Sequence, residues 1–203
     1  MENKIARIIS YLFHPIFLPV YCLLFLFNLK AYFTFEIIFK ARLIMLAFVS
    51  VTTIIFPLLI IYMMKRQGFI QSFKMETLQE RRVPYMIMVI FYFLTYNMFR
   101  QMELPWMYTN YMLGATILLS IVVVVNFWWK ISTHMIGIGG VFGVITGLAI
   151  KLDFDMMFLI VLVTILAGII GFARLKLDAH KPSEIYVGFL AGAIVMTGIF
   201  CFL

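Results

Sequence analysis

Residues 156–203 read MMFLIVLVTILAGIIGFARLKLDAHKPSEIYVGFLAGAIVMTGIFCFL. Two long apolar runs flank a short polar island at residues 173–184, which reads ARLKLDAHKPSE. Coiled as a helix, each apolar run approaches the roughly 30 Å thickness of the hydrocarbon core of a bilayer. The end of the chain therefore predicts two membrane-spanning helices joined by a polar loop.

The rest of the chain repeats this pattern. Further apolar runs lie at residues 8–29, 43–64, 84–99, 108–129 and 135–150. The first run contains His14-Pro15 and Pro19, so six full spans preceded by an irregular entry segment are the alternative to seven spans. We expect an all-α integral membrane protein, a bundle of about six to seven transmembrane helices that forms one domain over residues 1–203.

Composition agrees with a multi-pass protein of the cell membrane. Of the 203 residues, 65% are hydrophobic and only 12% are charged, with a mean hydropathy of +1.07. A soluble domain has about a quarter of its residues charged. The first run is too long for the apolar region of a removable signal peptide and lacks a small-residue cleavage site. The two cysteines lie inside apolar runs and indicate neither a disulfide framework nor a metal site.

The formal net charge of +7 comes from basic residues in short loops between apolar runs. In that position, anionic lipid headgroups and phosphate substrates are the expected partners, and we do not expect nucleic-acid binding.

The polar island has a spacing suited to phosphate chemistry. Arg174 stands six residues before His180, and Glu184 stands four residues after it. A carboxylate there would hold the imidazole in one tautomer and make its other nitrogen a better nucleophile, while Arg174 would offer a planar fork to an anion. The alternative is an ordinary loop whose charges serve topology and solvation.

Two other polar clusters precede the island. Lys74 and Arg81 are seven residues apart, so on a helix they would project from one face toward one anion. The stretch 130–134, KISTH, is followed by Gly137, Gly139, Gly140 and Gly143. These glycines allow either anion binding at a helix start or close helix packing in lipid. Because two runs separate each cluster from the next, all three should emerge on the same side of the membrane.

Taken in order, the clusters read Lys-x6-Arg, Ser-x-His and Arg-x5-His-x3-Glu, between residues 74 and 184. This order resembles the tripartite signature of the type 2 phosphatidic acid phosphatase superfamily, which includes membrane lipid phosphatases. The resemblance implies that His180 attacks phosphorus and forms a phosphohistidine, that Glu184 orients it, and that His134 protonates the leaving oxygen. It implies a phosphate-binding set of Lys74, Arg81, Ser132 and Arg174. It also implies an enzyme that needs no metal and no cofactor.

The chain departs from the family pattern at several positions. Arg82 stands where the family has proline, and Arg82 is an alternative phosphate ligand to Arg81. Ile131 and Thr133 replace a proline and a glycine in the second motif. In the third motif Ala173 replaces serine and Glu184 replaces aspartate. These differences indicate a divergent subgroup and leave open a slow or inactive member.

We therefore expect a lipid phosphatase that hydrolyses a membrane lipid phosphate or diphosphate monoester. A lipid phosphotransferase and a non-catalytic lipid-binding or transport protein are the alternatives. The resemblance implies a site on the periplasmic or exoplasmic side, whereas the positive-inside rule favours the cytoplasm, because most cations lie on the side of the three clusters.

Overall fold

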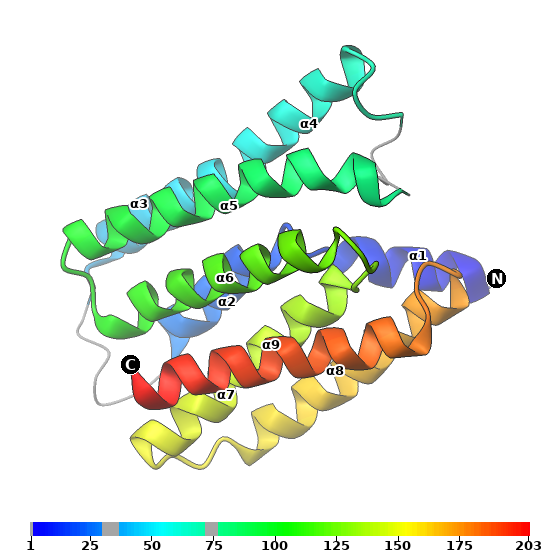
Figure 1. Cartoon of the computed structure of the whole chain (residues 1–203). Coiled ribbons are helices and arrows are strands. Elements are labelled where there is room, and N and C mark those ends of the chain that lie inside the picture. Colours follow the sequence, from blue (N-terminus) through cyan, green and yellow to red (C-terminus); the bar gives the residue numbers. More distant parts are fainter. Residues whose placement is uncertain (1, 30–36, 72–76) are drawn as a thin grey trace. The chain divides into compact units, whose positions relative to one another are not determined.

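The computed structural model describes residues 2–29, 37–71 and 77–203, and all regular structure in these ranges is helical (Figure 1). The helices are α1 (Glu2–Leu12), α2 (Leu18–Asn28), α3 (Phe39–Ser50), η1 (Val51–Ile55), α4 (Phe56–Arg66), α5 (Leu78–Gln101), α6 (Trp106–Val125), α7 (Thr133–Leu152), α8 (Met157–Lys176) and α9 (Pro182–Phe202). The expected all-α class is confirmed.

Five helices of the described chain are long and apolar enough to cross a membrane. They are Phe39–Arg66, which joins α3, η1 and α4, together with α6, α7, α8 and α9. The chain is therefore a multi-pass membrane protein, but the expected count of six to seven spans is too high.

The expected span at residues 8–29 is broken into two short helices. Helix α1 ends at Leu12 and α2 begins at Leu18, and each has only 11 residues. Pro15 disfavours helical backbone at His14 and supplies no N–H of its own, so the apolar run turns at this dipeptide. The structure thus has the irregular entry segment that the prolines indicated.

The expected span at residues 84–99 lies inside α5. This helix has 24 residues but is not among the five apolar spans. Thr95, Asn97 and Arg100 lower its hydropathy, and its first turns are charged.

The π-helical segment η1 keeps the span Phe39–Arg66 continuous. Pro57 lies two residues after η1, and because it has no N–H it cannot donate the α-helical hydrogen bond to the carbonyl of Thr53. The backbone widens instead, and the N–H of Phe56 donates to the carbonyl of Val51, five residues earlier. The hydroxyl of Thr53 bonds to the Val49 carbonyl at 2.7 Å, so this buried group has a partner.

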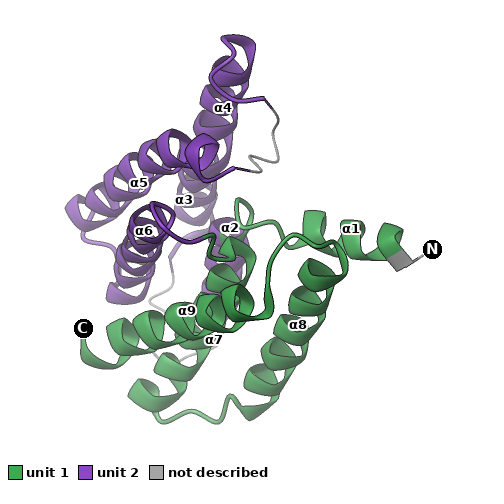
Figure 2. Ribbon diagram, turned by 45° about the vertical axis from the view of Figure 1, so that its right-hand side comes forward, with its two compact units in different colours: residues 1–18, 130–203 green, residues 19–129 purple. Residues whose placement is uncertain are grey.

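The chain forms two compact units (Figure 2). The first unit consists of residues 1–18 and 130–203 and contains α1, α7, α8 and α9. The second consists of residues 19–129. A single domain over the whole chain stays a prediction.

In the first unit, α7, α8 and α9 run alternately in opposite directions (Figure 1). The start of α7, the end of α8 and the start of α9 therefore meet at one end of this unit. Helices α7 and α9 approach closely because glycines face the neighbouring backbone. A Cβ at Gly143 would lie 2.6 Å from the Ala193 carbonyl oxygen, and one at Gly192 would clash with the Ile136 carbonyl. These contacts favour the helix-packing interpretation of the glycines.

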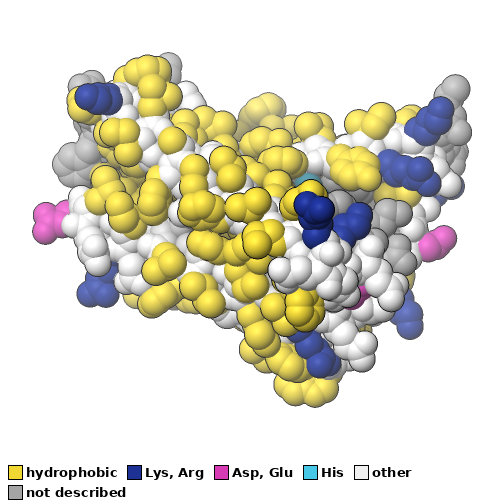
Figure 3. Space-filling view, turned by 90° about the horizontal axis from the view of Figure 1, so that it is seen from above, with side chains coloured by type: hydrophobic (Ala, Val, Ile, Leu, Met, Phe, Trp, Pro, Cys, Tyr) yellow, Lys and Arg dark blue, Asp and Glu magenta, His cyan; other side chains and the backbone are white. Residues whose placement is uncertain are grey.

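Large hydrophobic side chains cover much of the surface in Figure 3, as expected for helices that face lipid.

Candidate functional site

The loop between α8 and α9 places His180 against Glu184. Pro182 occupies the first position of α9, where no N–H is needed, so His180 precedes the helix and Glu184 lies in its first turn. Nδ1 of His180 donates to Oε2 of Glu184 at 2.8 Å, and the Lys181 N–H donates to the same oxygen at 3.2 Å. Both side chains are buried. The carboxylate thus fixes the tautomer of His180, with its lone pair on Nε2.

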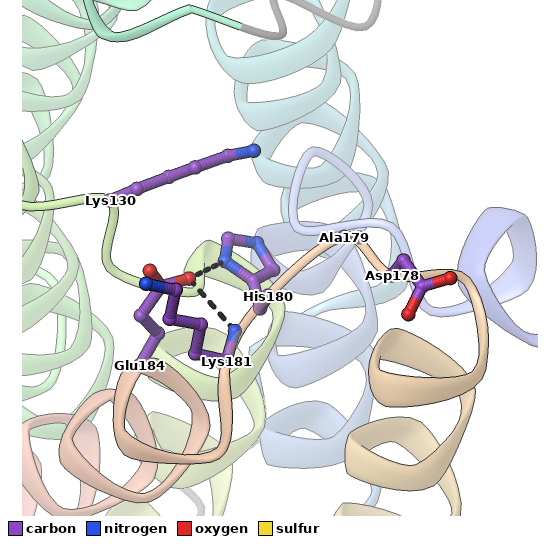
Figure 4. A pocket seen from close by; sticks show the side chains of 6 residues that line it. All are labelled: Lys130, Asp178, Ala179, His180, Lys181 and Glu184. Atoms are coloured by element: carbon purple, nitrogen blue, oxygen red, sulfur yellow. Dashed lines mark hydrogen bonds and ion pairs between the residues drawn. The ribbon is translucent and has the colours of Figure 1, made fainter.

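A cavity of about 270 Å³ opens beside this pair. Its lining residues are Lys130, Asp178, Ala179, His180, Lys181 and Glu184. Figure 4 shows the Lys130 side chain extending past the imidazole, whereas Asp178 points away from the histidine–carboxylate pair. The volume is just below the roughly 300 Å³ at which small-molecule pockets begin, so it suits a headgroup rather than a whole lipid.

A second group of contacts lies at the same end of the first unit. His134, in the first turn of α7, has Nε2 3.1 Å from the carbonyl oxygen of Ser10. A terminal nitrogen of Arg174, in the last turn of α8, donates to the Ser10 hydroxyl at 3.3 Å. The start of α7 lies beside the start of α9, because the Ser132 N–H donates to the Glu184 carbonyl at 3.3 Å. The structure therefore brings together His134, Arg174 and His180 from three helix ends.

Ser132 precedes α7 and is fully buried. Its N–H donates to the Glu184 carbonyl at 3.3 Å, which ties the start of α7 to the start of α9. Its hydroxyl has no hydrogen-bond partner among the described residues. A buried hydroxyl in this state has lost its water without compensation, and a ligand that reached it would restore the lost hydrogen bond.

The residues of the first motif do not belong to the first unit. Lys74 lies outside the described residues. Arg81 and Arg82 stand in the first turns of α5, in the second unit. Arg81 is buried, and the Arg82 guanidinium lies 4.7 Å from the centre of the Phe127 ring and donates to the Phe127 carbonyl at 3.3 Å. The buried Nε of Arg82 has no hydrogen-bond partner among the described residues, and the choice between Arg81 and Arg82 as the phosphate ligand stays a prediction.

Sequence reasoning missed several residues at the site. His14 is not among the predicted site residues, yet its ring meets the His134 ring edge to face, with centroids 5.3 Å apart. Ser10, Lys130 and Lys181 were not singled out as site residues. Only the rarity of histidine could have drawn attention to His14, since the chain has just three.

The local electrostatics favour an anion. The N-terminal ends of α7 and α9 carry partial positive charge, and Arg174 and Lys176 offset the negative end of α8. Two lysines, Lys130 and Lys181, line the cavity. Within residues 2–29, 37–71 and 77–203, no three His, Cys, Asp or Glu side chains group in a way that could hold a metal ion.

Comparison of the chain with models of protein families, with curated proteins and with solved structures finds no match. The function is therefore inferred from the residues of the chain and their geometry.

Proposed function

We propose that this protein is a metal-independent membrane lipid phosphatase that hydrolyses a lipid phosphate or diphosphate monoester through a phosphohistidine intermediate. The observation that best supports it is the buried His180–Glu184 pair, at the same end of the first unit as His134 and Arg174. The motif order in the sequence supports it independently.

His180 has the arrangement of an activated nucleophile. Its Nδ1–H is held by Glu184, which leaves the lone pair of Nε2 for attack on phosphorus. Positive charge develops on the ring as the N–P bond forms, and the adjacent carboxylate stabilises it. His134 would donate a proton to the leaving oxygen.

The surrounding groups suit the charge of a transferring phosphoryl group. Catalysis of this transfer depends mainly on positioning and on positive charge around the equatorial oxygens. Arg174, Lys130 and Lys181 supply formal charge, and the α7 and α9 N-terminal ends supply backbone dipoles. The Ser132 hydroxyl would donate a further hydrogen bond.

The apolar surroundings favour a lipid substrate. The cavity accommodates a headgroup, while the exposed surfaces of the spanning helices are hydrophobic and would keep the tail in the bilayer. Phosphatidic acid, phosphatidylglycerol phosphate, a polyprenyl diphosphate and a lipid A phosphate are the candidate substrates. We place the site on the periplasmic or exoplasmic side, as the motif resemblance implies. The variant Asp178→Cys would test this side. In intact cells a membrane-impermeant thiol reagent should label this cysteine if the site faces the periplasm or the cell exterior.

The decisive experiment is phosphate release from a panel of these lipids by purified protein in the presence of a chelator. We expect release by the wild type, retention in Lys151→Ala at the far end of α7, and a loss of about 1,000-fold or more in His180→Ala. A phosphoryl group trapped on the wild type and absent from His180→Ala would identify the nucleophile. Equal release by wild type and His180→Ala would refute the proposal.

The same panel separates the alternatives. A phosphotransferase would form a new phosphorylated lipid when a hydroxyl acceptor is added and would depend on His180 in the same way. A non-catalytic lipid-binding protein would bind lipid phosphates without turnover. In that case Arg174→Gln would weaken binding, whereas His180→Ala and His134→Ala would bind as well as the wild type.

A further inference from the structure

The end of α1 contacts two residues that the proposed chemistry needs. The carbonyl oxygen of Ser10 lies 3.1 Å from Nε2 of His134, and the Ser10 hydroxyl lies 3.3 Å from a terminal nitrogen of Arg174. Ser10 is buried, and it lies 124 residues from His134 in the sequence. One residue of α1 therefore meets both groups, one through its backbone and the other through its side chain.

The Ser10 carbonyl determines which nitrogen of His134 is protonated. A carbonyl oxygen only accepts hydrogen bonds, so Nε2 of His134 must be the donor. In neutral His134 the lone pair then lies on Nδ1, and in the imidazolium the proton that can be transferred is the one on Nδ1. His180 has the opposite arrangement, because its Nδ1 donates to Glu184. The two histidines are thus held in opposite tautomers by different partners.

A third histidine restrains the His134 ring. His14 meets it edge to face, and Nδ1 of His14 accepts a hydrogen bond from the Ile16 N–H at 3.3 Å. His14 is an exposed residue, yet desolvation by its surroundings lowers the pKa of His14 to about 4, and the Arg174 charge acts in the same direction. His14 is therefore neutral at pH 7 and packs on His134 without adding a positive charge.

We propose that Ser10 and His14 are positioning residues of the phosphate site, and that they make Nδ1 the nitrogen through which His134 exchanges protons. The catalytic consequence rests on the proposed function, whereas the tautomers and contacts do not. The N-terminal helix α1 and the turn after it would then position catalytic groups of the site, in addition to leading the chain into the membrane.

The proposed steps balance as follows. Nε2 of His180 forms a bond to phosphorus while the bond from phosphorus to the leaving oxygen breaks, and that oxygen keeps the electron pair. Imidazolium His134 gives its Nδ1 proton to the leaving oxygen and keeps its Nε2–H, which donates a hydrogen bond to the Ser10 carbonyl. In the second step a water oxygen attacks phosphorus, a water proton returns to Nδ1 of His134, and the N–P bond breaks with its electrons returning to His180.

Nitrogen NMR tests the tautomers without any need for turnover. Protein labelled with ¹⁵N-histidine in lipid nanodiscs at about pH 9, above the usual histidine pKa, should show three neutral rings. His14→Gln and His180→Gln assign the signals. We expect His134 and His14 to be protonated at Nε2 and His180 at Nδ1. An unprotonated Nε2 on His134 would overturn the proposal, whatever the protein's activity.

Ser10→Ala tests the contact with Arg174. It removes the hydroxyl but keeps the carbonyl, so the His134 signal should not change, while the Kd for inorganic phosphate should rise about 3- to 10-fold, as expected for a lost hydrogen bond to a charged group. Ser120→Ala is the matched control, because the Ser120 hydroxyl bonds to the Thr116 carbonyl within α6. An unchanged Kd in Ser10→Ala would overturn the role assigned to the hydroxyl.

Two variants of His14 test the ring contact by activity. His14→Ala removes the packing surface and should lower kcat about 10-fold or more with little change in KM, because a displaced proton donor slows chemistry more than binding. His14→Phe keeps a ring on His134 and should restore most of this loss. Equal kcat values for His14→Ala and the wild type would overturn the role of His14. A wild type without turnover but with the expected tautomers would instead refute the lipid phosphatase function alone.

Discussion

Replacing Ser132 by alanine should make the ligand-free protein more stable and make it bind phosphate less tightly. Ser132 is completely buried, and its hydroxyl has no hydrogen-bond partner in the part of the chain that the structure describes. Its backbone N–H, by contrast, is satisfied by the Glu184 carbonyl and is retained in the variant. The substitution therefore removes one orphan polar group and little else.

The expected gain in stability follows from the cost of that orphan group. A buried hydroxyl without a partner costs about 1–3 kcal/mol, and removal of the oxygen gives back part of this while leaving a small void. A net gain of about 1 kcal/mol corresponds to a rise in Tm of about 2–4 °C for a chain of this size. Thermal unfolding of wild type and Ser132→Ala in the same detergent measures this difference.

The expected loss of affinity has the opposite sign. A hydrogen bond to a charged phosphate oxygen contributes about 1.5–3 kcal/mol, so the Kd for inorganic phosphate should rise about 10- to 150-fold. Titration calorimetry on the same two samples measures it. Stability and binding thus move in opposite directions, which an ordinary structural serine would not produce.

Ser120→Ala provides the matched control. The Ser120 hydroxyl already donates to the Thr116 carbonyl at 2.8 Å, so its removal should lower the Tm slightly or not at all and leave phosphate binding unchanged. A Ser132→Ala protein that loses stability and binds phosphate like the wild type would show that this hydroxyl has a structural partner, and the reasoning would be wrong.

Two further substitutions test other parts of the structure. Glu184→Gln keeps an oxygen that can accept a hydrogen bond from His180 but removes the negative charge. Because charge-assisted hydrogen bonds are roughly twice as strong as neutral ones, turnover in an activity assay should fall about 10-fold while the fold stays intact. Glu103 is exposed, and the control variant Glu103→Gln should have the activity of the wild type. Gly192→Ala forces a Cβ onto backbone of α7 and should lower the Tm by several degrees, whereas Gly198→Ala, which has open space in the same helix, should hold or raise it. Equal Tm changes for the two glycines would contradict the observed packing.

The helices at the end of the chain were predictable because hydropathy alone determines them. The run expected at residues 135–150 is a helix at Thr133–Leu152, and the run expected at 156–172 is one at Met157–Lys176. The first run is a span only in the seven-span expectation, and the irregular entry segment that His14-Pro15 indicated is what the structure has. Hydropathy alone does not register this break, which comes from the restriction that proline places on the backbone of the preceding residue.

The contacts of the site were predictable only where they are local. His180 and Glu184 are four residues apart, and their pairing follows from a helix start at Pro182. Ser10 joins His134 and Arg174 across 124 and 164 residues, and no periodicity or spacing signals such a contact. The sequence could name His134 and Arg174 as candidates, but the residue that holds them becomes visible only after the helices pack.

Helix packing also explains why Ser132 lies at the site at all. Gly188 stands one turn after Glu184 in α9, and a Cβ at Gly188 would lie 2.9 Å from the Ser132 carbonyl oxygen. Only glycine therefore lets the two backbones come close enough for the Ser132 N–H to reach the Glu184 carbonyl at 3.3 Å. The same glycine-mediated approach that packs α7 against α9 in lipid thus places a buried hydroxyl beside the residue that orients His180. In this unit, the packing of the helices and the geometry of the site have one cause.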